Sequence, residues 1–140
     1  MDIVDALLKH HKEIRELMEK AAHDKRKFAT LKKHLEVHHR NEELYFLNEI
    51  KNKSGIGDEA AEAAEEHYYI DFMLRDLERF PHDNKRWGVK FGILQEFTEH
   101  HLKEEEEDIF REIHKVMEKR ELEEMGKEFE TVKKRQLEAL

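Results

Sequence analysis

Histidines interrupt the apolar stripes of this chain. Four segments carry apolar residues at the three- and four-residue spacing of an amphipathic helix, and each stripe contains a histidine. In the first segment His11 lies between Leu7 and Ile14. Because an amphipathic helix buries its apolar face, the fold must carry several imidazoles into its interior and give each of them a partner.

Two of these segments also place a glutamate one turn after the histidine. His38 precedes Glu42, and His101 precedes Glu105. Residues four apart in a helix share a face, with about 6 Å of rise between them. A buried carboxylate is costly unless it is paired or bound to a metal, so the two pairs indicate a cation site.

The breaks in the pattern predict an all-α fold. They fall near residues 23–25, 52–57 and 80–84, and the chain has one proline and five glycines. The predicted helices span about 2–22, 26–51, 58–79, 84–118 and 121–138. Short connections favour an up-down-up-down four-helix bundle over about 2–118, with an additional short C-terminal helix packed over its end or side. We expect residues 1–140 to form a single domain.

The positions of the histidines and glutamates predict that they meet at one level of the bundle. In antiparallel helices, residues at the same level lie at equal distances from the connecting turn. The midpoints between the candidates of successive helices fall in or beside the three breaks. The predicted metal ligands are His11, His38, Glu42, His67, His101 and Glu105.

Periodicity leaves some of these choices open. His10 lies on a stripe as good as that of His11, and His39 on one as good as that of His38. Glu106 competes with Glu105 after a slight change of helix phase. One turn before His38, His34 could line the site. His100 lies on a solvated face, and His23, His82 and His114 are expected to be ordinary structural histidines rather than ligands.

Composition narrows the class of protein. No cysteine is present, which excludes thiolate metal sites, and the net charge of -8 argues against a nucleic-acid partner. The sequence has no signal-peptide pattern and no apolar run of the ~20 residues that cross a membrane, so we expect a cytoplasmic protein.

Imidazole and carboxylate ligands suit iron, manganese or zinc. Six ligands exceed the four of a structural zinc site and favour two iron ions with a bridging oxide or hydroxide.

Taken together, the motifs resemble a known family, the hemerythrin-like (HHE) cation-binding domain. They are His11-x-x-Ile14, His38-x-x-x-Glu42-Glu43, Glu66-His67 and His101-x-x-x-Glu105-Glu106-x-x-Ile109-Phe110. The resemblance favours His11 over His10 and His38 over His39. It implies that the four histidines are terminal iron ligands and that Glu42 and Glu105 are bridging ones.

One departure from the oxygen-carrying hemerythrins bears on function. Asp71 stands where their third helix carries a second histidine, so Asp71 is a hydrogen-bond partner of a histidine, a solvated side chain or a seventh ligand. The ligand set is similar to that of the broader bacterial and archaeal relatives. The expected function is binding or sensing of dioxygen or nitric oxide at a di-iron site. The alternatives are iron storage or delivery, and an enzyme that reduces nitric oxide or peroxide.

Overall fold

The computed structural model describes residues 1–53 and 55–139, and within these ranges all regular secondary structure is helical, which confirms the predicted all-α class. None of the described helices has an apolar stretch long enough to cross a membrane. Ser54, in the second predicted break, lies outside the described residues. The long helices are α1 (Ile3–His23), α2 (Phe28–Glu42), α4 (Gly57–Arg79), α5 (Arg86–Glu107) and α7 (Lys119–Glu138).

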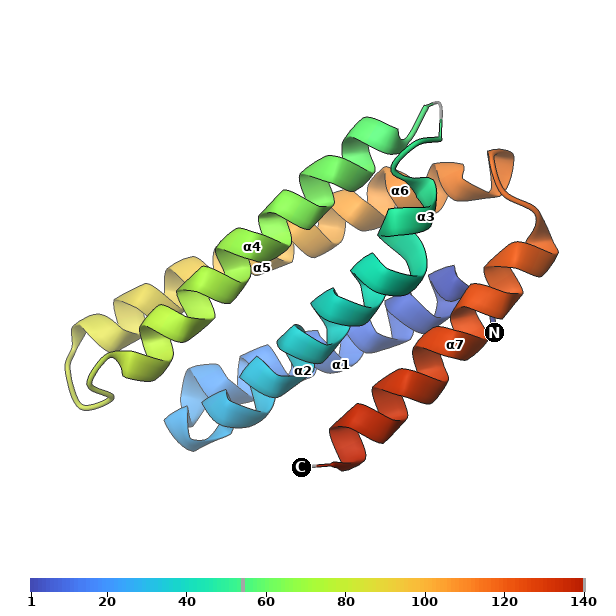
Figure 1. Ribbon diagram of the computed structural model, residues 1–140. Helices are drawn as coiled ribbons and strands as arrows, with labels where there is room; N and C mark the ends of the chain where they lie inside the picture. The colour runs from blue at the N-terminus through green and yellow to red at the C-terminus, as the bar shows by residue number, and fades with distance from the viewer. Residues whose placement is uncertain (54, 140) are drawn as a thin grey trace.

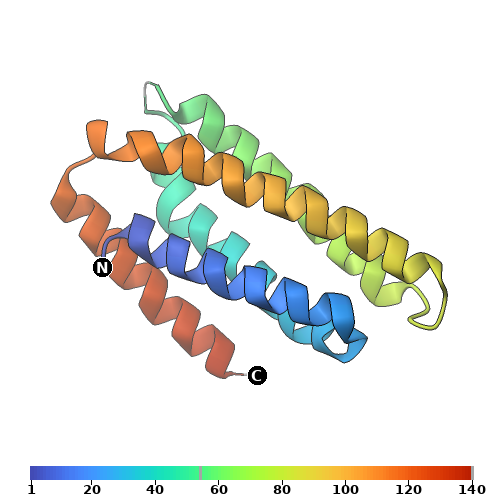
Figure 2. The same ribbon diagram turned by 180° about the vertical axis from the view of Figure 1, so that it is seen from behind.

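Contacts between the long helices define the arrangement. α1 packs against α2 and α5, and α4 packs against α5 and α2, so the four helices enclose a common interior (Figure 1). α7 runs along α1 and α2, on the side away from α4 and α5, and the N-terminus lies beside it (Figure 2). The C-terminal helix therefore covers a side of the four helices.

Local sequence sets several helix ends. The Asp2 side chain accepts a hydrogen bond from the Asp5 backbone N–H at 2.9 Å and caps α1. Asp24, in extended backbone, ends α1 and accepts from Arg26 N–H to begin the short 3₁₀ turn η1 (Lys25–Lys27). At α7, Glu118 and Glu121 form a reciprocal capping box.

Two predicted helices are interrupted just past the glutamates of the site. After Glu42 the chain forms one turn of π-helix, η2 (Glu43–Leu47), and then α3 (Asn48–Ile50). After α5 the helix breaks at Asp108 and continues as α6 (Ile109–Glu112) and the 3₁₀ turn η3 (Ile113–Lys115). The continuous helices predicted over 26–51 and 84–118 were therefore wrong in detail. A local change of winding leaves the apolar stripe nearly in phase, so periodicity does not reveal it.

The apolar core has two parts. One part surrounds the start of α1 and includes Leu7, Phe46 and Phe110. The other surrounds the end of α1 and includes Ile14 and Trp87. The predicted histidines and glutamates occupy the layer between the two, so the helices hold a polar cluster in the middle of an apolar interior.

Candidate metal centre

The structure brings all six predicted ligands together between α1, α2, α4 and α5. Each is at most 3% exposed. Their positions are successive turns of helices that are anchored on both sides by the apolar core. The cluster comprises His11 from α1, His38 and Glu42 from α2, His67 from α4, and His101 and Glu105 from α5.

The side chains form two overlapping groups. In each group the potential ligand atoms lie within 4.8 Å of one another. His11 and His38 form one group with Glu42 and Glu105, and His67 and His101 form the other with the same two glutamates. Two cation positions that share both carboxylates fit this arrangement.

His39 also belongs to the cluster. It is 1% exposed, forms a third group with His67 and His101, and stacks on the His67 ring with centroids 4.0 Å apart. Helical periodicity makes His38 and His39 alternatives, but α2 borders both α1 and α4. The two residues point about 100° apart on the helix, so His38 reaches His11 while His39 reaches His67.

Asp71 is the signal that could have revealed His39. It stands where the third helix of the oxygen-carrying hemerythrins has a second histidine, and the structure shows its carboxylate accepting a hydrogen bond from His39 Nδ1 at 2.9 Å. The imidazole therefore comes from α2, and α4 supplies the carboxylate that orients it. Of the three roles considered for Asp71, the structure shows that of hydrogen-bond partner.

Four of the cluster histidines donate through Nδ1 to a carboxylate that lies outside the cluster. The pairs are His11 with Glu106 at 2.7 Å, His39 with Asp71 at 2.9 Å, His67 with Glu43 at 2.9 Å and His101 with Glu66 at 2.7 Å. An ionised carboxylate only accepts, so Nδ1 carries a proton, and whenever the ring is neutral its Nε2 has a free lone pair. Such outer carboxylates fix the ring orientation of metal-binding histidines.

The inward-facing atoms have no hydrogen-bond partner among the residues that the structure describes. They are the five Nε2 atoms and both carboxylate oxygens of Glu42 and Glu105. The shortest approaches are His67 Nε2 to Glu42 Oε1 at 3.0 Å and His11 Nε2 to Glu105 Oε1 at 3.2 Å. Two atoms that bind one ion at about 2.1 Å and a right angle lie about 3 Å apart. Buried polar atoms are costly when unpaired, and a pair of cations fits them.

The pKa values of the cluster residues are shifted because two carboxylates are held close together, away from solvent. Burial, together with the neighbouring Glu42, raises the pKa of Glu105 to about 7. Burial opposes protonation of His11, but the carboxylate of Glu105, 3.2 Å from Nε2, and that of Glu106, which accepts from Nδ1, outweigh it and raise the His11 pKa to about 9. Burial and neighbouring His67 lower the pKa of His39 to about 4. The repulsion between the glutamates would be relieved by a cation.

The other residues that the sequence left as possible ligands lie outside the two groups that share Glu42 and Glu105. Glu106 does not enter the groups of potential ligands; it accepts hydrogen bonds from His11 and from Arg15.

His10 is buried but points to His38 and His34. His100 is exposed, as predicted, and the side chains of His23, His82 and His114 are exposed as well.

Comparison with known proteins identifies the class. The family model of the hemerythrin HHE cation binding domain matches residues 2–113. The chain belongs to this family, which the sequence motifs had predicted. No curated protein matches the sequence.

A solved structure shares the fold. The crystal structure of a hemerythrin HHE cation binding domain-containing protein from Mycobacterium kansasii has a TM-score of 0.83 to this chain. The two are 23% identical, over 99% of this chain and 89% of the other. The likeness covers the C-terminal helix as well as the four helices that hold the cluster.

Proposed function

We propose that this chain is a non-haem di-iron protein whose up-down-up-down bundle encloses the two metal ions. The observation that carries the proposal is the sharing of Glu42 and Glu105 by two groups of histidines. Carboxylates bridge metal ions in bundle proteins that hold paired iron. Imidazole and carboxylate ligands without thiolates suit iron, and zinc or manganese are the other metals that fit.

The ligands divide unequally between the two positions. His11 and His38 serve one position, whereas His39, His67 and His101 serve the other. If both positions shared Glu42 and Glu105, the first would have one protein ligand fewer than the second. A small molecule can therefore bind at the position beside His11.

The surroundings favour a small uncharged ligand. Phe110 stacks on the His11 ring with centroids 5.5 Å apart, and Phe129 lies 5.9 Å from the His38 ring. Both phenylalanines are buried. An apolar wall beside an open coordination position suits dioxygen or nitric oxide, and we propose that the protein binds or senses one of them.

The test combines metal analysis with optical spectra. We expect two iron ions per chain after anaerobic reconstitution, and a spectral change on adding dioxygen or nitric oxide. Glu105→Ala should lower the iron content, because it removes a bridging ligand. Fewer than two ions in the wild type, or no spectral change with either gas, would contradict the proposal.

Repeated turnover of nitric oxide or peroxide with a reductant would instead indicate an enzyme, and rapid iron loss to a weak chelator would indicate storage or delivery.

A further inference from the structure

We propose that Glu62, Glu66 and Glu104 form an entry site where a divalent metal cation is captured from solvent before it passes to His101 and Glu105. The proposal rests on the metal-binding function proposed above. It adds a surface site and a route between α4 and α5, and neither is part of the buried cluster.

Three carboxylates from two helices converge at this place. Glu62 and Glu66 are one turn apart on α4, and Glu104 faces them from α5. One oxygen of each lies within 4.8 Å of the others. The neighbouring Glu104 raises the pKa of Glu62, which is the effect of like charges held close together. A divalent cation would relieve this repulsion.

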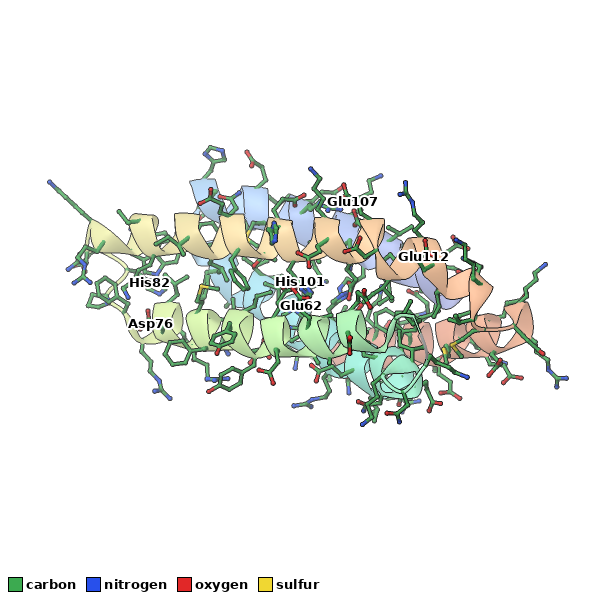
Figure 3. All side chains as sticks on the ribbon, turned by 90° about the horizontal axis from the view of Figure 1, so that it is seen from above. Glu62, Asp76, His82, His101, Glu107 and Glu112 are labelled. Carbon is green, nitrogen blue, oxygen red and sulfur yellow. The ribbon has the colours of Figure 1, made fainter. Side chains whose placement is uncertain are left out.

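The carboxylates border a hollow that leads to the buried cluster. Its lining includes Glu62, Glu66 and Glu104 on the outside and His101 and Glu105 on the inside. Figure 3 shows the labelled Glu62 and His101 together between α4 and α5. Glu105 is 3% exposed, and neither of its oxygens has a hydrogen-bond partner in the described part of the chain. The buried carboxylate of Glu105, which has no such partner, thus lines the same hollow as the exposed Glu62 and the half-buried Glu66 and Glu104.

The negative charge of the lining and the small volume of the hollow indicate that the occupant is a metal cation that has lost part of its hydration shell. The lining also includes Glu59 and Asp108, and none of the lysines or arginines in the described ranges contributes to it. The hollow has a volume of about 10 Å³, which admits one water-sized guest. A fully hydrated metal ion does not fit, so carboxylate oxygens must replace its waters on the way in. Hard oxygen ligands at the surface followed by a histidine and a carboxylate inside provide this exchange.

Glu66 connects the two sites. Its Oε1 accepts the hydrogen bond from His101 Nδ1 at 2.7 Å, which leaves the His101 Nε2 facing the buried cluster. Because Glu66 orients a predicted ligand, its removal would alter the buried site as well as the entry site. The two outer carboxylates, Glu62 and Glu104, are therefore the residues to change.

The experiment measures loading rates of Co(II), a spectroscopic probe that needs no oxidation step. Metal-free full-length chain is mixed with Co(II) in a stopped-flow instrument, and its absorption is followed. The double variant Glu62→Gln/Glu104→Gln should load about tenfold more slowly at low ionic strength, because capture by charge raises association rates. The difference should shrink at high salt, and the final two ions per chain should be retained.

A matched control carries the same change in net charge. Glu123→Gln/Glu128→Gln alters two exposed carboxylates of α7, which packs on α1 and α2, away from the hollow. It should load at close to the wild-type rate, and circular dichroism should show that all three proteins are equally folded. An unchanged loading rate in the Glu62/Glu104 variant, an equal slowing in the control, or a variant that no longer holds two ions would overturn the entry site. A wild type that takes up no Co(II) would overturn the metal-binding function and the entry site with it.

Discussion

His38 Nδ1 lies 2.9 Å from the Nδ1 of His10, and both rings are fully buried. The other four cluster histidines each donate at this nitrogen to a carboxylate; within the described residues, His38 meets an imidazole instead. Burial, with a contribution from Lys133, lowers the pKa of His10 to about 2, so its ring is neutral. A neutral acceptor polarises His38 less than a carboxylate does, and the two proposed metal positions therefore differ in ligand strength.

The first prediction concerns this contact. His10→Ala leaves the buried His38 N–H without its acceptor, which costs about 1–3 kcal/mol of the free energy of unfolding. It should also weaken metal binding at the His11–His38 position by roughly 10–100-fold while the other position stays tight. Titration against a competing chelator measures both affinities. His10→Gln offers an acceptor oxygen and should recover part of the loss; equal affinities in wild type and His10→Ala would refute the role of His10.

The second prediction concerns the opposite position. Asp71→Ala removes the acceptor of the His39 Nδ1–H and should weaken binding at the His39–His67–His101 position by roughly 10–100-fold. Asp76→Ala is the matched control, since Asp76 lies on the same helix and pairs with Lys90 at the surface. The same chelator titration should show little change for the control. If Asp71→Ala binds both ions as tightly as Asp76→Ala does, the carboxylate does not orient a ligand.

The third prediction separates stability from function at a bridging glutamate. Glu42 is fully buried, and its oxygens have no hydrogen-bond partner in the part of the chain that the structure describes. Replacing it with Met, which has a similar volume, should raise the free energy of unfolding of the metal-free chain by about 1–4 kcal/mol. Added metal should no longer stabilise the Glu42→Met variant. It should raise the free energy of unfolding of the wild type by about 2.7 kcal/mol at a metal concentration of a hundred times the Kd.

Urea unfolding, with excess chelator and then with Fe(II) under anaerobic conditions, measures both effects. Glu128→Met, an exposed position on α7, controls for the substitution itself. A metal-free Glu42→Met chain that is less stable than the wild type would show that the carboxylate already has a stabilising partner without a metal.

The sequence predicted the cluster because its signal is periodic. The stripe through His11 and the i, i+4 pairs beginning at His38 and His101 repeat with the helix, and helical phase placed them inward. His39 was missed because its burial depends on how α2 packs between α1 and α4, which is a tertiary property. The breaks after Glu42 and at Asp108 were missed for a related reason: they depend on backbone winding rather than on which side chains are apolar.

The last prediction tests the docking of α7 on the start of α1. A Cβ at Gly126 would lie 2.5 Å from the Met1 carbonyl oxygen and 2.7 Å from the Ile3 nitrogen, both backbone atoms. Gly126→Ala should therefore push α7 outward and cost about 1–3 kcal/mol, despite the better helix propensity of alanine. Gly92→Ala in α5 is the control, since its Cβ would meet nothing within 4 Å and should stabilise by roughly 0.5–1 kcal/mol. Thermal unfolding measures both, and the two substitutions should shift Tm in opposite directions. A rise in Tm for Gly126→Ala like that for Gly92→Ala would mean that α7 does not pack this closely on the N-terminus.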